Sequence, residues 1–227
     1  MKIVVFAPHP DDEIMGCGGS ILKWIEEGHE LHIIYITDNR ALFSEGHVND
    51  ELVEELAEPY KKLTQDQLAE LCLEEAQKAA KAMGLLDSNI HFFKFHDLDA
   101  QNQIERGIEL SQEILHDADR IIVSSNNNTH PDHQAAHNIA KHAAKKLDLK
   151  DIEFYIYSLY VPLKIAKEKL IKVKIVDYRD KIYEIMKIYK TQLALVDTRT
   201  GWEYLKRKRY ERFGRFYLSE IDMHFNF

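Results

Sequence analysis

The sequence of 227 residues is poor in cysteine, in long apolar runs and in positive charge. Its two cysteines, Cys17 and Cys72, are too few for a disulfide framework and lack the spacing of a metal site. Isolated thiols are typical of a reducing compartment, so we expect a cytoplasmic protein. No apolar run approaches the ~18 residues of a membrane-spanning helix, and the first residues have the pattern of a strand rather than a secretory signal. The sequence therefore predicts no transmembrane segment.

The charge balance also excludes a class of partner. With 30 Lys and Arg against 38 Asp and Glu, the net charge is −8, which disfavours nucleic acid as a partner. Apolar residues make up 45% and charged residues 30% of the chain, the proportions of an ordinary globular protein. A chain of this length can bury one core, and no repeat, low-complexity tract or linker divides it. We expect a single domain over residues 1–227.

What the sequence does contain is an alternation of short apolar runs and helical patterns. The apolar runs predict strands at 3–7, 30–37, 89–93, 120–123, 153–160 and 172–176. The helical patterns lie at 20–27, 64–83, 103–116, 134–146, 178–192 and 201–212, and the basic run at 206–209 is expected on a solvated helix face. Strands that alternate with helices predict an α/β fold with a Rossmann-like, mostly parallel sheet flanked by helices.

The first predicted strand ends in a cluster of polar side chains. Residues 7–13 read Ala-Pro-His-Pro-Asp-Asp-Glu, which places one imidazole and three carboxylates directly after the strand. The prolines favour an extended backbone and delay the start of a helix. Open α/β folds bind their ligands at the carboxyl ends of strands, which favours a cation site here. An acidic helix N-terminus, favoured by the helix dipole, would also explain the carboxylates. This motif alone leaves both interpretations open.

A second cluster, His-Pro-Asp-His at 130–133, follows the predicted strand at 120–123. Two strand ends that carry the same His-Pro-Asp arrangement can converge on one point if their strands are neighbours, so the pair predicts a metal site at the carboxyl ends of the strands. The glycines at 16, 18 and 19 suggest a dinucleotide-binding turn as an alternative. The acidic residues 11–13 stand between strand and glycines and would repel a pyrophosphate. We expect the glycines to let the backbone pack closely beside the site.

The two motifs, with Gly-Cys-Gly-Gly after the first, resemble the PIG-L/LmbE family of zinc-dependent N-acetylglucosamine deacetylases. The similarity covers most of residues 1–145 in order and spacing and is thin beyond residue 150. The family has a His-x-Ser-Gln-like segment near its C-terminus, where this chain has Tyr-Lys-Thr-Gln at 189–192. The resemblance implies a hydrolase that removes the acetyl group from an N-acetylated sugar, or a sugar conjugate, by means of a zinc-bound water.

The resemblance also implies which side chains hold the metal. Two imidazoles and one carboxylate with an open position suit a catalytic zinc, and the family pattern assigns His9, Asp12 and His133 as ligands of one divalent metal per chain. Zinc brings the pKa of a bound water to about 7, so that hydroxide is available near neutral pH.

The remaining motif residues are expected to act on the substrate. The resemblance leaves Asp11 beside the metal, where it can take a proton from the bound water. His130 would assist the oxyanion or act as an acid toward the leaving amine, and Asp132 would orient that imidazole and raise its pKa.

Three further segments are expected near the substrate. Asp38 and Arg40 follow the predicted strand at 30–37, whose end reaches the substrate pocket in the resembling family, and Arg40 either binds the substrate or is solvated. Residues 97–99 form another pocket edge or a simple turn. The acidic connection at 41–63 is long, and such connections are more often functional than idle. We expect a lid, with a surface segment or a homo-oligomer contact as alternatives.

Two other classes of protein remain open. Two histidines and a carboxylate also form the facial triad of non-haem iron oxygenases. Loss of acetate from a model amide under nitrogen, without an oxoacid cosubstrate, would separate hydrolase from oxygenase. A non-catalytic metal-bearing sugar-binding module would not need Asp11 and His130, which favours the enzyme. These residues do not identify the N-acetylated substrate, and they favour zinc without fixing the native metal.

Overall fold

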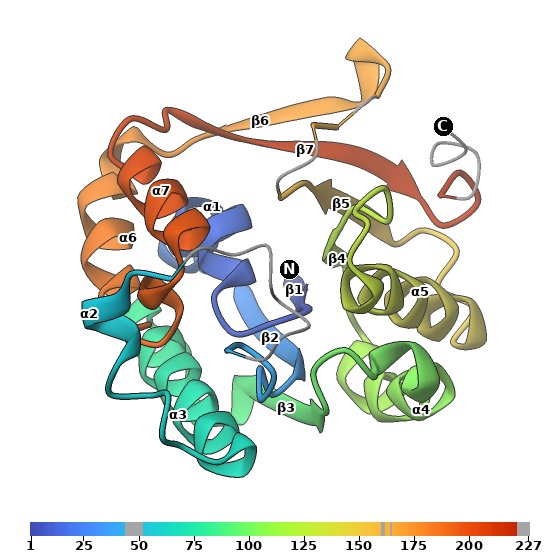
Figure 1. The fold of residues 1–227 in the computed structure, drawn as a ribbon. Helices are drawn as coiled ribbons and strands as arrows, with labels where there is room; N and C mark the ends of the chain where they lie inside the picture. The colour runs from blue at the N-terminus through green and yellow to red at the C-terminus, as the bar shows by residue number, and fades with distance from the viewer. Residues whose placement is uncertain (44–51, 160–161, 164, 222–227) are drawn as a thin grey trace.

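The computed structural model describes residues 1–43, 52–159, 162–163 and 165–221 (Figure 1). Within these residues one seven-stranded sheet has the order β3-β2-β1-β4-β5-β7-β6. The strands are β1 (Lys2–Ala7), β2 (Glu30–Thr37), β3 (Ile90–Phe95), β4 (Arg120–Ser124), β5 (Glu153–Tyr157), β6 (Leu170–Lys174) and β7 (Tyr210–Tyr217). The first five pair in parallel, whereas β7 is antiparallel to β5 and β6. The prediction of a mostly parallel, Rossmann-like sheet is confirmed.

Helices cover both faces of this sheet (Figure 1). They are α1 (Asp12–Glu26), α2 (Glu54–Ala57), α3 (Gln65–Met83), α4 (Ile104–Leu115), α5 (Pro131–Lys146), α6 (Arg179–Met186) and α7 (Val196–Leu205). One core lies between the sheet and α1, α3 and α6, and the other between the sheet and α4 and α5. Residues 3, 5 and 7 of β1 face the first core and residues 4 and 6 face the second, as the two-residue period of a strand requires. Within the described residues, every helix is too short or too polar to span a lipid bilayer.

Helix α3 follows its sequence signals closely. Thr64 caps the helix, because its side chain accepts a hydrogen bond from the backbone N–H of Gln67 while the Gln67 side chain binds the Thr64 N–H. Gly84 ends the helix in the left-handed conformation, with φ 111°. The predicted helix at 64–83 is therefore confirmed.

Helix α1 differs from its prediction. The helix begins at Asp12 rather than near residue 20, and it is broken at Cys17, whose φ is −144°. The break frees the backbone N–H groups of Gly19 and Ser20, and both donate to the buried carboxylate of Glu211 in β7, at 2.9 and 2.7 Å. A carboxylate from a distant strand thus caps the second part of the helix, and no local sequence signal reports such a contact.

The glycines of α1 give it close contact with its neighbours, as expected. A Cβ atom on Gly16 would lie 2.5 Å from the ring of Tyr157, and one on Gly19 would lie 2.6 Å from Ile175. Real Cβ atoms do not approach other atoms this closely, so both positions require glycine for packing.

The last third of the chain contains the clearest errors of prediction. The predicted helix at 201–212 is wrong beyond Leu205, because the basic run at 206–209 lies in the turn before β7. The predicted helix at 178–192 ends at Met186, and the strand at 153–160 ends at Tyr157. Strand β7 has adjacent buried residues at Phe213 and Gly214, which interrupt the alternation that would have revealed a strand.

Candidate active site

The site is built where β1 and β4 end, and these strands are neighbours with Phe6 paired to Val123. The turn after β1 is tied to β2, because the N–H and hydroxyl of Thr37 both donate to the carbonyl of Pro8, at 3.0 and 2.9 Å. Within the turn, the N–H of His9 donates to the Asp12 carboxylate at 2.9 Å. Both motifs therefore meet at the middle of the carboxyl edge of the sheet.

The turn after β4 leads directly into α5. His130 is the N-cap of this helix, since its Nδ1 accepts a hydrogen bond from the Asp132 N–H at 3.3 Å, and Pro131 occupies the first helical position. The Asn128 side chain accepts the N–H of His130 at 2.9 Å and contacts Nδ1 of His133 at 3.2 Å. The helix predicted from residue 134 thus begins at Pro131, so His133 projects from its first turn.

Three ligand-type side chains from the two turns come together. Asp12 Oδ2 lies 3.2 Å from His9 Nδ1 and 3.4 Å from His133 Nε2, and the ligand atoms of these residues all lie within 4.8 Å of one another. In a tetrahedral zinc site with bonds of about 2.0–2.1 Å, neighbouring ligand atoms are about 3.3 Å apart. The spacing and the donor chemistry both fit zinc.

Two carboxylates hold the far side of the His9 ring. His9 Nε2 lies 3.3 Å from Asp97 Oδ1 and 3.3 Å from Asp132 Oδ2. The Asp132 carboxylate also accepts the backbone N–H groups of Leu98 and Ala100, at 2.7 and 3.1 Å. A proton on Nε2 that is donated to a carboxylate leaves the Nδ1 lone pair facing Asp12, the usual arrangement of a metal-binding histidine.

Asp97 was not among the predicted site residues. Residues 97–99 were predicted as a pocket edge or a simple turn, without a role for the carboxylate of Asp97, which is buried. Asp97 follows β3, so the rule that ligands gather at the carboxyl ends of parallel strands is the signal that could have identified it.

The two adjacent aspartates have opposite electrostatic environments. Burial, followed by repulsion from Asp12 and Glu13, raises the pKa of Asp11 well above its usual value. Burial also opposes ionisation of Asp12, but His133 and His9 outweigh it and lower the pKa of that carboxyl. Where the surroundings push apart the pKa values of two neighbouring carboxyl groups, the two groups usually have different chemical roles. Asp12 is suited to bind a cation and Asp11 to accept a proton.

The histidines differ in the same way. Burial lowers the pKa of His9, but hydrogen bonds to Asp12, Asp132 and Asp97 raise it well above its usual value overall. The carboxylates thus favour a positive charge at this point. Burial lowers the pKa of His133, which keeps its imidazole neutral as a metal ligand requires.

The surroundings of His130 favour a neutral imidazole. Burial and the nearby rings of His9 and His133 lower the pKa of His130 to about 4. Asp132 acts in the predicted direction, raising that pKa, but does not prevail. Because His130 Nδ1 accepts the Asp132 N–H, the ring proton belongs on Nε2.

Asp38 and Arg40 lie beside this cluster and bind each other. The guanidinium of Arg40 donates to Asp38 Oδ2 at 2.9 Å and pairs with the exposed Asp66 at 3.0 Å. Asp38 is buried and accepts the N–H of Asp97 at 3.3 Å. The pair therefore supports the loop that carries Asp97, and substrate binding by Arg40 stays a prediction.

Arg40 also borders a cavity of about 340 Å³, lined mainly by apolar side chains: Phe43, Leu52, Tyr60, Leu63 and Leu68, with Lys61 and Gln65. The connection predicted as a lid, 41–63, contributes to this lining, although its residues 44–51 lie outside the described residues. Leu52 pairs with Leu195, and the Val53 N–H donates to the Ala194 carbonyl at 2.8 Å. The described part of the connection thus packs on the C-terminal third.

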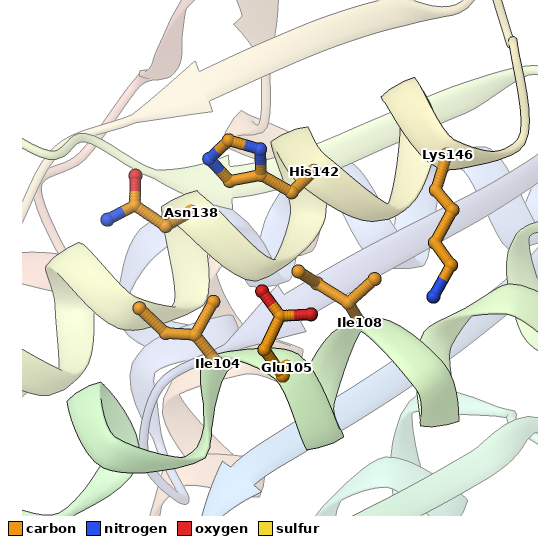
Figure 2. A pocket seen from close by; sticks show the side chains of 6 residues that line it. All are labelled: Ile104, Glu105, Ile108, Asn138, His142 and Lys146. Carbon is orange, nitrogen blue, oxygen red and sulfur yellow. The ribbon is translucent and has the colours of Figure 1, made fainter.

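A second cavity, of about 350 Å³, lies between α4 and α5 (Figure 2). It is lined by Ile104, Glu105, Ile108, Asn138, His142 and Lys146. None of these residues belongs to the motifs after β1 and β4, so the predicted chemistry does not involve this cavity.

Comparisons with known proteins find a family model and solved structures that are similar to this chain. The family model PIG-L, described as GlcNAc-PI de-N-acetylase, matches residues 4–144. The N,N'-diacetylchitobiose deacetylase from Pyrococcus horikoshii is 17% identical in sequence, with a TM-score of 0.72 over 96% of this chain and 85% of that chain. The zinc-inhibited form of a teicoplanin deacetylase is 11% identical, with a TM-score of 0.68 over 95% of this chain and 97% of that chain.

A sequence relative, a glucosamine-6-phosphate deaminase-like protein from Bacteroides thetaiotaomicron, is 42% identical over 36 residues. That match covers 16% of this chain and 5% of the relative, so the chain corresponds to a small part of that protein. At these identities the solved structures show a shared fold, and the family model shows the family.

Proposed function

The chain belongs to the PIG-L deacetylase family, and from this premise we propose that it is a zinc-dependent hydrolase that removes the acetyl group from an N-acetylated sugar of the N-acetylglucosamine type. The observation that carries the proposal is the convergence of His9, Asp12 and His133 within 4.8 Å, with Asp11 beside them. The chemistry of these donors and their spacing support one zinc ion per chain.

The proposed roles follow from the environment of each side chain. Bound zinc supplies Lewis acidity, which lowers the pKa of a water and polarises a carbonyl. Asp11 takes the proton of the attacking water, because its raised pKa makes it a better base than an ordinary carboxylate. His130 donates the proton on Nε2 as a hydrogen bond to the developing oxyanion, which a neutral imidazole can do.

Asp132 has a different part in this proposal from the one expected. Its carboxylate is engaged by His9, Leu98 and Ala100, so it orients the metal ligand His9 and joins two loops. Its backbone N–H donates to His130 Nδ1 at 3.3 Å. Asp132 thus fixes the tautomer of His130 by way of the backbone.

The direct test is release of acetate from a panel of N-acetylated sugars, including N-acetylglucosamine, its disaccharide and a phosphoinositol conjugate. We expect zinc-loaded protein to release acetate and amine in equal amounts, with the activity lost on chelation and restored by zinc. Equal rates under nitrogen and air would exclude the oxygenase alternative. If the protein binds the sugars in a zinc-dependent manner but releases acetate from none of them, the proposal is overturned in favour of a sugar-binding module.

The proposal also extends to organisation and location. We treat residues 1–227 as one domain because β7 and α1 share direct contacts across the chain. The buried free thiols of Cys17 and Cys72 support a reducing, cytoplasmic location. A homo-oligomer stays a prediction, which light scattering of the purified protein would test.

A further inference from the structure

The backbone of Asp11 has an unusual conformation. Its φ is 108° and its ψ is −23°, in the left-handed region that side chains other than glycine rarely adopt. Such a conformation is strained and persists where the surrounding structure imposes it. Asp11 precedes α1 as its N-cap, but its side chain makes no capping hydrogen bond. The stabilising contacts must therefore come from other groups.

The carboxylate of Glu13 provides one of these contacts. Glu13 has an exposed fraction of 0%, and its Oε2 accepts the backbone N–H of Asp11 at 3.2 Å. The other oxygen, Oε1, accepts the hydroxyl of Tyr189 at 2.5 Å. A buried carboxylate must be hydrogen-bonded to be tolerated, and here both oxygens have a partner. One partner is the strained residue itself, and the other comes from a distant part of the chain.

Tyr189 fixes this arrangement from the far side. It is also fully buried and follows α6, which brings it to Glu13 across 176 positions of sequence. Its hydroxyl lies 3.4 Å from that of Tyr35 in β2, so the sheet supports the same network. A side chain held at both ends has little freedom to turn, and the Glu13 carboxylate is therefore a fixed acceptor for the Asp11 N–H.

We infer that Glu13 and Tyr189 are positioning residues, which hold Asp11 in its left-handed conformation and thereby fix the place of its carboxylate beside Asp12. The inference rests on the proposed function, in which Asp11 is the base of the deacetylation. Neither Glu13 nor Tyr189 touches the substrate. Their hydrogen bonds act on the backbone of Asp11, so acceptor geometry rather than negative charge is what Glu13 supplies.

The test compares three substitutions. Tyr189→Phe removes only the hydroxyl, Glu13→Ala removes the acceptor, and Glu13→Gln keeps an oxygen acceptor for the Asp11 N–H while removing the charge. We expect kcat to fall about 10–100-fold in Tyr189→Phe and Glu13→Ala, the range for groups that orient an active residue, with KM and zinc content unchanged. Glu13→Gln should retain most of the kcat of the parent.

Tyr157→Phe is the matched control for loss of a buried tyrosine hydroxyl. Tyr157 lies beside α1, and its hydroxyl donates to the Phe6 carbonyl at 3.3 Å rather than to the Glu13 carboxylate. We expect this variant to lose stability, as Tyr189→Phe does, but to keep the kcat of the parent. If Tyr189→Phe keeps the kcat of the parent, as Tyr157→Phe is expected to do, the hydroxyl of Tyr189 is only structural and the inference fails.

A readout independent of activity separates this inference from the proposed function. A crystal structure of Glu13→Ala should show that residue 11 has left the region of positive φ, whatever reaction the protein catalyses. Retention of φ near its parental value in Glu13→Ala would overturn the inference even if deacetylation is confirmed. A parent protein that releases no acetate would instead refute the proposed function, while the backbone measurement would still decide the role of Glu13.

Discussion

Histidines cluster at both ends of the parallel strands, at the carboxyl edge and at the opposite, amino edge of the sheet, and the two clusters differ in the side chains around them. At the carboxyl edge, His9 and His133 lie among three carboxylates, those of Asp12, Asp97 and Asp132. At the opposite edge, His32 of β2 and His91 of β3 lie against each other, with Nδ1 and Nε2 3.0 Å apart and the rings stacked. One carboxylate, that of the exposed Glu30, reaches this pair, at 2.7 Å from His32.

This difference explains why one edge suits a cation and the other does not. Carboxylates around an imidazole supply ligand oxygens, orient the ring and offset positive charge, whereas a second imidazole supplies none of the negative charge. In the part of the chain that the structure describes, both groups of three or more potential ligands include His9 and lie at the carboxyl edge. Histidine content alone therefore does not identify a metal site; the number of carboxylates around it does.

The largest effect that would test this contrast is loss of the metal. His133→Ala removes one of three ligands and should reduce the zinc content from about one per chain to near zero, with loss of activity, because the remaining two donors cannot complete the site. His91→Ala, at the opposite edge, is the matched control and should keep both. Elemental analysis of the two purified variants measures the outcome. Stoichiometric zinc in His133→Ala would refute the assigned ligand set.

The next effect separates the two aspartates of the first turn. Asp11→Asn should keep zinc but lower kcat on the order of 10²–10⁴-fold, since the amide has nearly the shape of the carboxyl group and cannot accept the proton. Steady-state kinetics and elemental analysis on the same preparation decide the matter. If the metal is lost instead, Asp11 is a ligand and the division of roles between Asp11 and Asp12 is reversed.

A smaller effect concerns the carboxylates behind the ligands. Asp132→Asn should weaken zinc binding by about 10–100-fold, because the amide cannot accept from His9, Leu98 and Ala100 as the carboxylate does. Competition with a fluorescent chelator measures the Kd. Asp119→Asn is the control at the opposite edge, where Asp119 accepts the Lys2 N–H at 2.7 Å, and its Kd should equal that of the parent. An unchanged Kd in Asp132→Asn would remove the distinction between the two edges.

The smallest effect lies at the histidine pair itself. Burial, and then the charge of His32, lower the pKa of His91 to about 4 from its usual 6.5. Between these pH values the unfolded chain binds a proton at His91 that the folded protein does not. The contribution of His91 to the free energy of unfolding is therefore fully present above pH 6.5 and is lost as the pH drops from 6.5 to 4. The full shift corresponds to about 3 kcal/mol, and partial exposure reduces the expected loss to about 1–2 kcal/mol.

Urea unfolding at pH 7 and pH 5 measures this effect as a difference between the parent and His91→Gln. The substitution should make the loss of unfolding free energy on acidification smaller, while zinc content stays unchanged at pH 7. If the unfolding free energy decreases equally in both proteins between pH 7 and pH 5, the imidazole pair makes no pH-dependent contribution to stability.

Much of the site could be predicted because its signals are local. The ligand-type residues follow β1 and β4 directly, and in a parallel sheet the rule for strand ends brings such segments to one edge. Helix α3 was equally predictable, since Thr64 and Gly84 are cap residues within the helix's own sequence. In both cases the physical cause of the structure lies within a few residues of its effect.

The errors share the opposite property. The capping of α1 after its break, the pairing of β7 and the contacts of Asp97 all depend on groups that are distant in sequence. Glu211 binds the N–H groups of residues 19 and 20, and β7 is a strand because it fits between β5 and β6. Propensity and periodicity describe a residue's own neighbourhood, so tertiary contacts of this kind were not accessible to them.

The contact between Glu211 and α1 has a consequence for how the protein is made. The helix that carries Asp12 leaves the ribosome early, whereas the carboxylate that caps its second part is synthesised 191 positions after Ser20. Contacts of such long sequence separation form late and slow the folding of a domain. The nascent chain therefore carries the motif that follows β1 on an incompletely capped helix until β7 emerges, and the site reaches its final form only after Glu211 has been synthesised.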